Sequence, residues 1–504
     1  MEILGNLALG LSVALSASNL LYCFVGVALG TFLGVIPGVG VLAAISMLFP
    51  LTYFLEPTTA LIMLAGIWYG TTYGGSTASI LLNVPGTPAN AIVCLDGYPM
   101  AQQGRAAVAL FMTTVASFIG GSIGIIILSA FAPMIARAAL SFGSAEYFAL
   151  MVLGLIAAIG ITGDSPLKGL IMVVVGLLLG LVGTDVFSGQ ARFTMGYLEL
   201  RDGIALVALA MGLFGVSEVI ASVGQVRNRN IDTRAISFAA MKPTRDDMRR
   251  SVAPVLRGTG IGAFFGALPG TGPSLAAFIA YAVERRAARE PERFGKGAIE
   301  GVMAPEAANN AADQTSFIPT LALGIPGSPT MALMLGVLII HGISPGPGLM
   351  TDQPALFWGL IMSFWIGNIL LVLLNVPLIG LWVRLLKVPY PLLFPAVLMF
   401  ICIGTFSVRN STFDVMLVLV FGGFGYICRQ LAFPAAPLLL GFVLGPLLEE
   451  HFRRAMLLSR GDVATFIDRP ISATLLAIAA LILVWTLAGS WLRAARAAGS
   501  GRGA

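Results

Sequence analysis

Four Pro-Gly pairs interrupt apolar stretches of the chain, and the backbone groups that they free could bind a ligand. Proline removes a backbone donor and glycine adopts conformations that a helix excludes, so each pair stops a helix. Inside a membrane the freed N–H and C=O groups must be buried in protein, face water or hold a ligand. Helix N-termini present N–H groups and positive dipole ends to an anion, whereas unwound carbonyls suit a cation such as Na⁺. The pairs are Pro37-Gly38, Pro85-Gly86, Pro269-Gly270 and Pro326-Gly327.

Small polar residues surround these pairs and could hydrogen-bond a carboxylate without supplying a fixed charge. We therefore expect the four breaks to converge near the middle of the membrane. The expected anion-binding residues are Gly38, Ser76, Thr77, Asn83, Gly86, Thr87, Gly270, Thr271, Asn310, Thr320, Gly327 and Ser328. The expected cation-coupling residues are Pro37, Val39, Pro269 and Asp313. Close helix packing is the alternative explanation for such Gly, Ser and Thr residues, and at any single position the sequence leaves both open.

Two acidic residues stand out, because ionisable side chains deep in a membrane are costly and often functional. Glu306 and Asp313 flank the pair Asn309-Asn310. They could instead lie at a cytoplasmic helix start, since Pro305 and a basic loop are close by. His341 lies between an apolar segment and a Gly/Pro loop, where a structural, interfacial role is expected rather than a proton relay.

The chain contains no cluster that is typical of an enzyme or a metal protein. It has no HExxH, no GxSxG with His and acid partners, and no Walker A sequence, so no site for ATP hydrolysis is expected within this chain. Its four cysteines form no CxxC pair and its two histidines are far apart, which indicates neither a disulfide framework nor a metal centre. We expect no enzymatic activity and no cofactor, apart from Na⁺ or H⁺ as a coupling ion.

The composition predicts an all-α polytopic membrane protein. The 504-residue chain is 57% hydrophobic and 11% charged, whereas a soluble domain carries about 25% charged residues. The net charge of +5 is attributed to basic loops, and no basic stretch is interleaved with aromatics as a nucleic-acid surface would be. Membrane helices of about 20 residues are expected at about 8–28, 58–72, 107–131, 145–162, 166–186, 203–223, 354–384, 391–407, 412–432, 434–448 and 471–492, with interrupted segments at about 29–50, 73–95, 252–283 and 314–340.

Basic residues concentrate in three regions, 227–250, 284–296 and the C-terminal tail, which the positive-inside rule assigns to the cytoplasm. The apolar segment 252–283 lies between the first two regions and is broken at Leu268–Pro273. Each of its arms has about 13 residues, too short to cross about 30 Å of hydrocarbon at 1.5 Å per residue. We therefore predict a re-entrant hairpin with both ends in the cytoplasm.

The chain also repeats itself. The run Gly34–Gly40 (GVIPGVG) recurs as Gly266–Gly272 (GALPGTG), and Asn83–Pro88 (NVPGTP) recurs as Gly324–Pro329 (GIPGSP). The flanks of the first copy carry almost no Lys or Arg and those of the second are very basic, which predicts inverted repeats. The expected organisation is a first membrane repeat at 1–225, a cytoplasmic linker at 226–251, a second repeat at 252–465, and a C-terminal membrane helix with a basic cytoplasmic tail at 466–504.

Several of these runs resemble the large membrane subunit of tripartite tricarboxylate transporters, the TctA family. The resemblance extends from about residue 20 to residue 465. It is carried by the runs Gly34–Gly40, Tyr73–Pro88 (YGGSTASILLNVPGTP), Ala304–Ala311 (APEAANNA) and Pro437–Glu449 (PLLLGFVLGPLLE).

The resemblance implies a multi-pass permease of the bacterial inner membrane that works with a small TctB-like membrane subunit and a periplasmic TctC-like binding protein. It implies di- or tricarboxylates such as citrate as substrates, with Na⁺ or H⁺ symport, and by fold-level analogy an elevator mechanism. A channel with a static filter and a membrane-embedded enzyme are the alternatives. The carboxylate, the coupling ion and the oligomeric state, for which a homodimer is one candidate, stay open.

Overall fold

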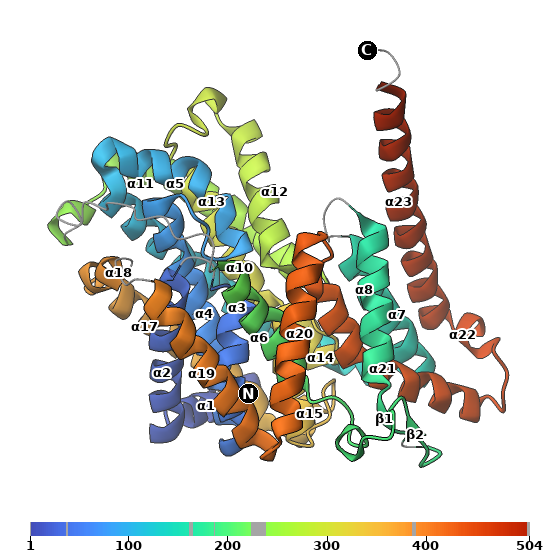
Figure 1. The fold of residues 1–504 in the computed structure, drawn as a ribbon. Coiled ribbons are helices and arrows are strands. Elements are labelled where there is room, and N and C mark those ends of the chain that lie inside the picture. The colour runs from blue at the N-terminus through green and yellow to red at the C-terminus, as the bar shows by residue number, and fades with distance from the viewer. Residues whose placement is uncertain are drawn as a thin grey trace.

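The computed structural model of the chain is almost entirely helical (Figure 1). It describes residues 2–36, 39–160, 165–185, 187–222, 238–385 and 390–500. Within these ranges six helical segments are long and apolar enough to cross a membrane: Ala17–Val35, Cys94–Ala139, Pro354–Asn375, Thr412–Gln430, Ala435–Leu458 and Pro470–Ala488. The prediction of an all-α polytopic membrane protein is confirmed at this level.

The first part of the chain forms two long packed helices followed by short pieces around the first two breaks. Its elements are α1 (Glu2–Ala14), α2 (Ala17–Val35), α3 (Val41–Leu48), η1 (Phe49–Phe54), α4 (Pro57–Leu82), η2 (Pro88–Ala91), α5 (Cys94–Met100), η3 (Ala101–Arg105) and α6 (Ala106–Ala139).

Two expected boundaries in this region are wrong. The span expected at 8–28 is divided between α1 and α2, where Ser16 caps the start of α2 by accepting a hydrogen bond from the Asn19 N–H. The helix expected at 58–72 continues into the interrupted segment expected at 73–95 and forms one helix, α4, which ends at Leu82 with Asn83 as its cap. Gly74 lies inside this helix and does not break it. An added Cβ there would meet the Thr31 and Val35 backbone, so this glycine allows α4 to pack closely on α2.

The middle of the chain adds a helical pair, a small β-hairpin and a helix with a π-helical turn. The elements are α7 (Ser144–Gly160), α8 (Pro166–Gly180), β1 (Gly183–Thr184), β2 (Ala191–Arg192), η4 (Leu198–Leu200), α9 (Leu206–Ala210), η5 (Met211–Val216) and α10 (Ser217–Ser222). The strands are antiparallel, with Gly183 opposite Arg192 and Thr184 opposite Ala191.

The second part begins with the predicted hairpin. Its elements are η7 (Phe238–Met241), α11 (Arg245–Gly266), α12 (Gly272–Ala287), η8 (Pro291–Arg293), α13 (Glu300–Thr315), α14 (Phe317–Leu323), α15 (Pro329–Ile340), α16 (Leu349–Asp352), α17 (Pro354–Asn375), α18 (Ile379–Leu385), α19 (Tyr390–Arg409), α20 (Thr412–Gln430), α21 (Ala435–Leu458), α22 (Thr465–Asp468) and α23 (Pro470–Ser500).

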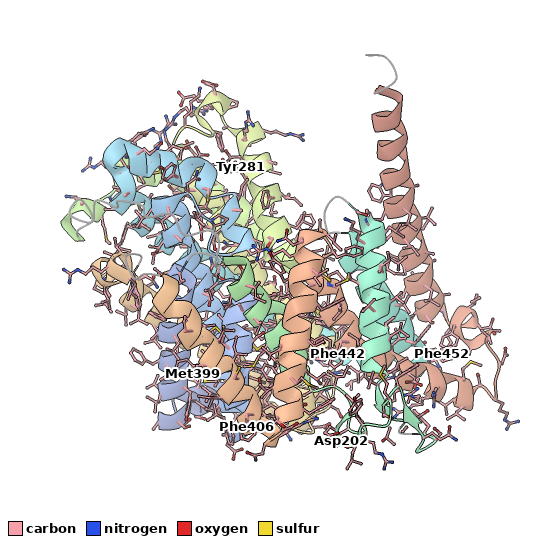
Figure 2. All side chains as sticks on the ribbon, viewed as in Figure 1. Asp202, Tyr281, Met399, Phe406, Phe442 and Phe452 are labelled. Atoms are coloured by element: carbon pink, nitrogen blue, oxygen red, sulfur yellow. The ribbon has the colours of Figure 1, made fainter. Side chains whose placement is uncertain are left out.

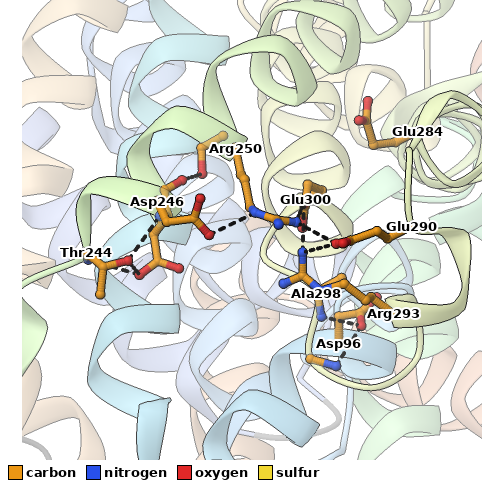
Figure 3. Close-up of polar contacts among 12 residues, drawn as sticks. Asp96, Thr244, Asp246, Arg250, Glu284, Glu290, Arg293, Ala298 and Glu300 are labelled. Atoms are coloured by element: carbon orange, nitrogen blue, oxygen red, sulfur yellow. Dashed lines mark hydrogen bonds and ion pairs between the residues drawn. The ribbon is translucent and has the colours of Figure 1, made fainter.

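Helices α11 and α12 pack against each other, and their outer ends lie at the same end of the molecule, at the top of Figure 1. The arms have 22 and 16 residues, so both exceed the expected 13. The first arm is longer because the capping box of Thr244 and Asp247 starts α11 inside the charged region. At the outer end Arg250 pairs with Asp246, Glu290 and Glu300 (Figure 3).

Outward-facing side chains on the peripheral helices are largely apolar, as a lipid-facing surface requires. Met399 and Phe406 of α19, both labelled in Figure 2, are 53% and 41% exposed. The last helix, α23, runs along one side of the molecule beside α7. Its Leu481 and Trp485 are also exposed.

One packing arrangement occurs twice. On α2, Gly26, Gly30 and Gly34 lie against the backbone of Met63, Ile67 and Thr71 of α4. On α11, Gly258, Gly262 and Gly266 lie in the same way against Ala304, Ala308 and Ala312 of α13. In both copies the third glycine, Gly34 or Gly266, comes three residues before the proline of a Pro-Gly pair. The residue that it contacts, Thr71 or Ala312, comes twelve residues before Asn83 or Gly324, where the next break begins. The repeated sequence runs therefore lie in equivalent local surroundings.

Candidate functional site

Two of the four Pro-Gly breaks, Pro85-Gly86 and Pro269-Gly270, contribute lining residues to one cavity, and the segments that directly follow the other two breaks reach the same cavity. The cavity has a volume of about 550 Å³, within the range of about 300–1,000 Å³ that is typical of small-molecule sites. Its lining comprises Gly40–Ala43, Trp68, Thr72, Pro85–Ala89, Leu213, Phe214, Ser217, Glu218, Gly270–Ser274, Ser328–Thr330, Arg429, Ala436, Pro437 and Leu440.

Four helices of eight or more residues begin at this cavity. They are α3, α12, α15 and α21, which start at Val41, Gly272, Pro329 and Ala435. Each start carries N–H groups without intrahelical partners and a partial positive charge. The convergence of several such starts makes the cavity suited to an anion.

Local backbone chemistry explains why two of the breaks have the same shape. Asn83 and Gly324 end the preceding helices in the left-handed conformation, with φ of 55° and 71°. Thr87 and Ser328 then cap the next element, each hydroxyl accepting a backbone N–H three residues on. The turn at Gly270 (φ 82°) also needs a left-handed residue. Its N–H donates to the Gly327 carbonyl at 3.0 Å, which joins the hairpin tip to the break before α15.

The residues that the sequence singled out are only partly brought together. Gly86, Thr87, Gly270, Thr271 and Ser328 line the cavity. Val39, Pro269 and Gly327 are immediate chain neighbours of lining residues, whereas Pro37 and Gly38 lie outside the described residues. Ser76, Thr77, Asn83, Asn310, Thr320 and Asp313 are not in the lining.

A buried polar network lies behind the cavity wall and joins the two halves of the chain. The Ser76 hydroxyl of α4 donates to Glu306 Oε1 at 2.5 Å, and the Ser117 hydroxyl of α6 donates to Oε2 at 3.1 Å. Asn90 Nδ2 donates to Ser76 Oγ at 2.8 Å and to Glu306 Oε1 at 3.2 Å. Asn310 Nδ2 donates to Ser117 Oγ at 2.8 Å. Glu306 is thus held by neutral donors from the first half.

Asp313 lies one side chain away from the cavity. The Thr72 hydroxyl, which lines the cavity, is 3.3 Å from Asp313 Oδ2. The other carboxylate oxygen, Oδ1, is buried without a hydrogen-bond partner in the described structure. Asp313 and Glu306 are both fully buried, and neither has a Lys, Arg or His within ion-pair distance among the residues described. A buried carboxylate without a countercharge is a candidate cation ligand.

The alternative of a cytoplasmic helix start for these two residues is wrong. Helix α13 begins at Glu300, so Glu306 lies nearly two turns inside it and Asp313 close to its other end. Both face the core because α13 packs against α6, α11 and α12. His341 lies where a structural role was expected, with Nε2 3.0 Å from the Thr52 carbonyl oxygen.

Some residues of the site were missed by the sequence reasoning. Asn90 and Ser117 complete the shell of Glu306, and Glu218 and Arg429 form an ion pair at the cavity, with Arg429 Nη1 2.7 Å from Glu218 Oε2. Arg429 looks in sequence like an ordinary cation at the end of an apolar helix. Only the packing of α20 on α10 brings it to the cavity.

Comparisons with known proteins identify one matching family model and two similar relatives. A family model described as the tripartite tricarboxylate transporter TctA family matches residues 20–440. The chain is 50% identical over 487 residues to an uncharacterized 52.8 kDa protein of Agrobacterium vitis named for the TAR-I ttuC′ 3′ region, covering 97% of both chains. It is 56% identical over 226 residues to a protein of the TAR-II ttuC′ 3′ region of Agrobacterium vitis, covering 45% of this chain and 93% of that relative. No solved structure matches it.

Proposed function

Because this chain belongs to the tripartite tricarboxylate transporter TctA family, we propose that it carries di- or tricarboxylates such as citrate across the bacterial inner membrane by secondary active uptake. A cation gradient drives the uptake. A periplasmic TctC-like protein delivers the substrate, and a small TctB-like membrane subunit completes the transporter. The observation that carries the proposal is the single cavity at which interrupted helices meet.

Anion binding is supported by the lining of that cavity. The N–H groups of the helix starts and the hydroxyl of Ser274 supply hydrogen-bond donors, which stabilise a carboxylate where water is scarce. The remaining anion-binding candidates act indirectly in this proposal. Ser76 and Asn310 order the network around Glu306, and Thr320 Oγ1 accepts the Gly327 N–H at 3.3 Å, which positions the break before α15.

Cation coupling is assigned to Asp313 in this proposal. Its unpartnered Oδ1 and the Thr72 hydroxyl beside Oδ2 offer oxygen ligands next to the substrate cavity, and Na⁺ at a broken helix takes such ligands together with backbone carbonyls. Carbonyls at Pro37, Val39 and Pro269 complete the proposed set. A cation bound there would lower the cost of placing an anion in the cavity, which is a physical basis for symport.

The proposed movement is that of an elevator built from inverted repeats. The equivalent packing of α2 on α4 and of α11 on α13 supports the duplication. The basic outer ends of α11 and α12 support a cytoplasmic location for that end of the molecule. The part that moves would then contain pieces of both halves, because the Ser76–Glu306 contact joins them.

The test is uptake of citrate by proteoliposomes that contain the full chain, its small subunit and its binding protein. We expect citrate to accumulate under an inward Na⁺ or proton gradient and to leak out when an ionophore collapses that gradient. Equilibration without accumulation would instead indicate a channel. Asp313→Asn keeps the size of the side chain but removes its charge, so uptake should lose its dependence on the cation. Asp352→Asn, at the exposed end of α16, is the matched control and should behave as wild type.

A further inference from the structure

The cavity contains one pair of opposite charges, and both partners belong to its lining. Arg429 at the end of α20 and Glu218 at the start of α10 form an ion pair of 2.7 Å. Among the described lining residues, Arg429 is the only lysine or arginine and Glu218 the only acidic residue. Their side chains are 47% and 26% exposed, so the guanidinium is accessible from the cavity.

The pair is not needed to hold α20 against the chain that contains α10. The preceding turn, η5, packs closely on α20 through glycines: an added Cβ on Gly425 would lie 3.1 Å from the Leu213 carbonyl oxygen, and one on Gly422 would meet the Val216 side chain. A half-exposed ion pair adds little stability to such an interface. The charges therefore call for another explanation.

The charges of the groups that line the cavity suggest a role for the ion pair. Helix starts carry only partial positive charges, whereas a substrate with two carboxylates carries two full negative charges. A planar guanidinium binds a carboxylate through two parallel hydrogen bonds, better than any other side chain does. In the structure Glu218 is the carboxylate that pairs with Arg429, which leaves the charged side chains of the described lining balanced.

We propose that Arg429 binds the second carboxylate of the substrate and releases Glu218 in exchange, so that this pair selects dicarboxylates and tricarboxylates over monocarboxylates. The proposal rests on the proposed function, since it needs the cavity to bind an organic anion. It assigns two opposite roles: Arg429 contributes affinity for the second carboxylate, and Glu218 competes with the substrate for the same guanidinium.

The two roles predict opposite effects of two charge-removing substitutions. Arg429→Gln should weaken binding of succinate and citrate at least tenfold and leave binding of succinamate, which has one carboxylate and the same length as succinate, unchanged. Glu218→Gln should tighten succinate and citrate binding several-fold, because the competitor has lost its charge. Arg429→Lys should be intermediate, since an ammonium lacks the two-pronged geometry.

The experiment measures equilibrium binding of radiolabelled succinate, citrate and succinamate to the purified full chain in detergent. Arg454→Gln and Glu450→Gln are matched controls, because that pair is similarly exposed, with an Nη2–Oε1 distance of 2.6 Å, and lies outside the cavity lining. Both controls should bind like wild type. Misfolding cannot make the Glu218→Gln variant bind succinate more tightly. This variant therefore still tests the proposal if Arg429→Gln fails to fold.

The outcomes separate the two proposals. Tighter binding by Glu218→Gln, together with loss of the succinate-over-succinamate preference in Arg429→Gln, supports the exchange. Wild-type preference in both variants would overturn the exchange and leave the proposed function standing. Failure of the wild-type chain to bind any of the three probes, alone or with its small subunit, would overturn both.

Discussion

Substitutions of two glycines on the same turn of α11 should change the free energy of unfolding in opposite directions. Gly262 faces α13, where an added Cβ would lie 2.7 Å from the Ala308 Cα, closer than real Cβ contacts come. Gly260 has no heavy atom within 4 Å of the position that a Cβ would take. Gly262→Val must therefore push α11 away from α13, whereas Gly260→Ala adds a methyl group in open space.

The magnitudes follow from packing and helix propensity. Overpacking a close contact destabilises a protein by about 1–3 kcal/mol. The higher helix propensity of Val relative to Gly offsets only about 0.3 kcal/mol of this. Gly262→Val should then lower the free energy of unfolding by about 1–3 kcal/mol. Gly260→Ala should raise it by about 0.5–1 kcal/mol, because alanine loses less backbone entropy.

The assay is unfolding of the full chain in detergent micelles titrated with SDS, followed by circular dichroism. Because α11 leads to the hairpin tip at Gly270, Gly262→Val should also weaken citrate binding, and Gly260→Ala should not. If both variants shift the unfolding midpoint in the same direction, or if Gly262→Val is as stable as wild type, the glycines of α11 do not act through contact with α13.

Three further outcomes are expected. Asp96→Ala removes the acceptor of the Gly295, Gly297 and Ala298 N–H groups. Each unpartnered group costs about 1–3 kcal/mol, so the free energy of unfolding should fall by about 3 kcal/mol or more. Faster proteolysis of the 288–299 segment would show this loss. The Phe187 N–H hydrogen bond lowers the pKa of Asp185 to about 2, so the ionised form is the one that is stabilised. The 183–192 hairpin should therefore keep its amide protection above about pH 4 and lose it between about pH 4 and 2, while Asp185→Asn should show no such transition. Among the four cysteines only Cys402 is partly exposed, and it lies on the lipid-facing helix α19, so a membrane-permeant maleimide should label it first and Cys402→Ser should remove the fast phase.

The sequence was most informative where local backbone chemistry decides the structure. Proline and glycine act on their own turn, so the breaks at Pro85-Gly86, Pro269-Gly270 and Pro326-Gly327 were predictable, and so was the hairpin. The same reasoning failed at Gly74 and Gly75, which lie inside α4. A glycine either ends a helix or lets two helices approach, and only the neighbouring helix decides which.

The polar network was harder to predict, because its members come from distant parts of the chain. Glu306 and Asp313 could be recognised as unusual, but their depth depends on where α13 starts, and the nearby basic loop allowed two answers. Asn90 and Ser117 carry no local signal that relates them to Glu306. Arg429 was overlooked because a cation at the end of an apolar helix is common. Whether the expected residues bind substrate or cation stays a prediction.

The hydrogen bond from the Gly270 N–H to the Gly327 carbonyl limits how the cavity can change shape. A single backbone hydrogen bond contributes only about 0.5–1.5 kcal/mol net, so thermal motion can break it without disturbing the helices on either side. While it is intact, the start of α15 and the α11–α12 turn must shift together; once it is broken, each is free to shift alone. Amide exchange at Gly270 would therefore count how often the two segments separate.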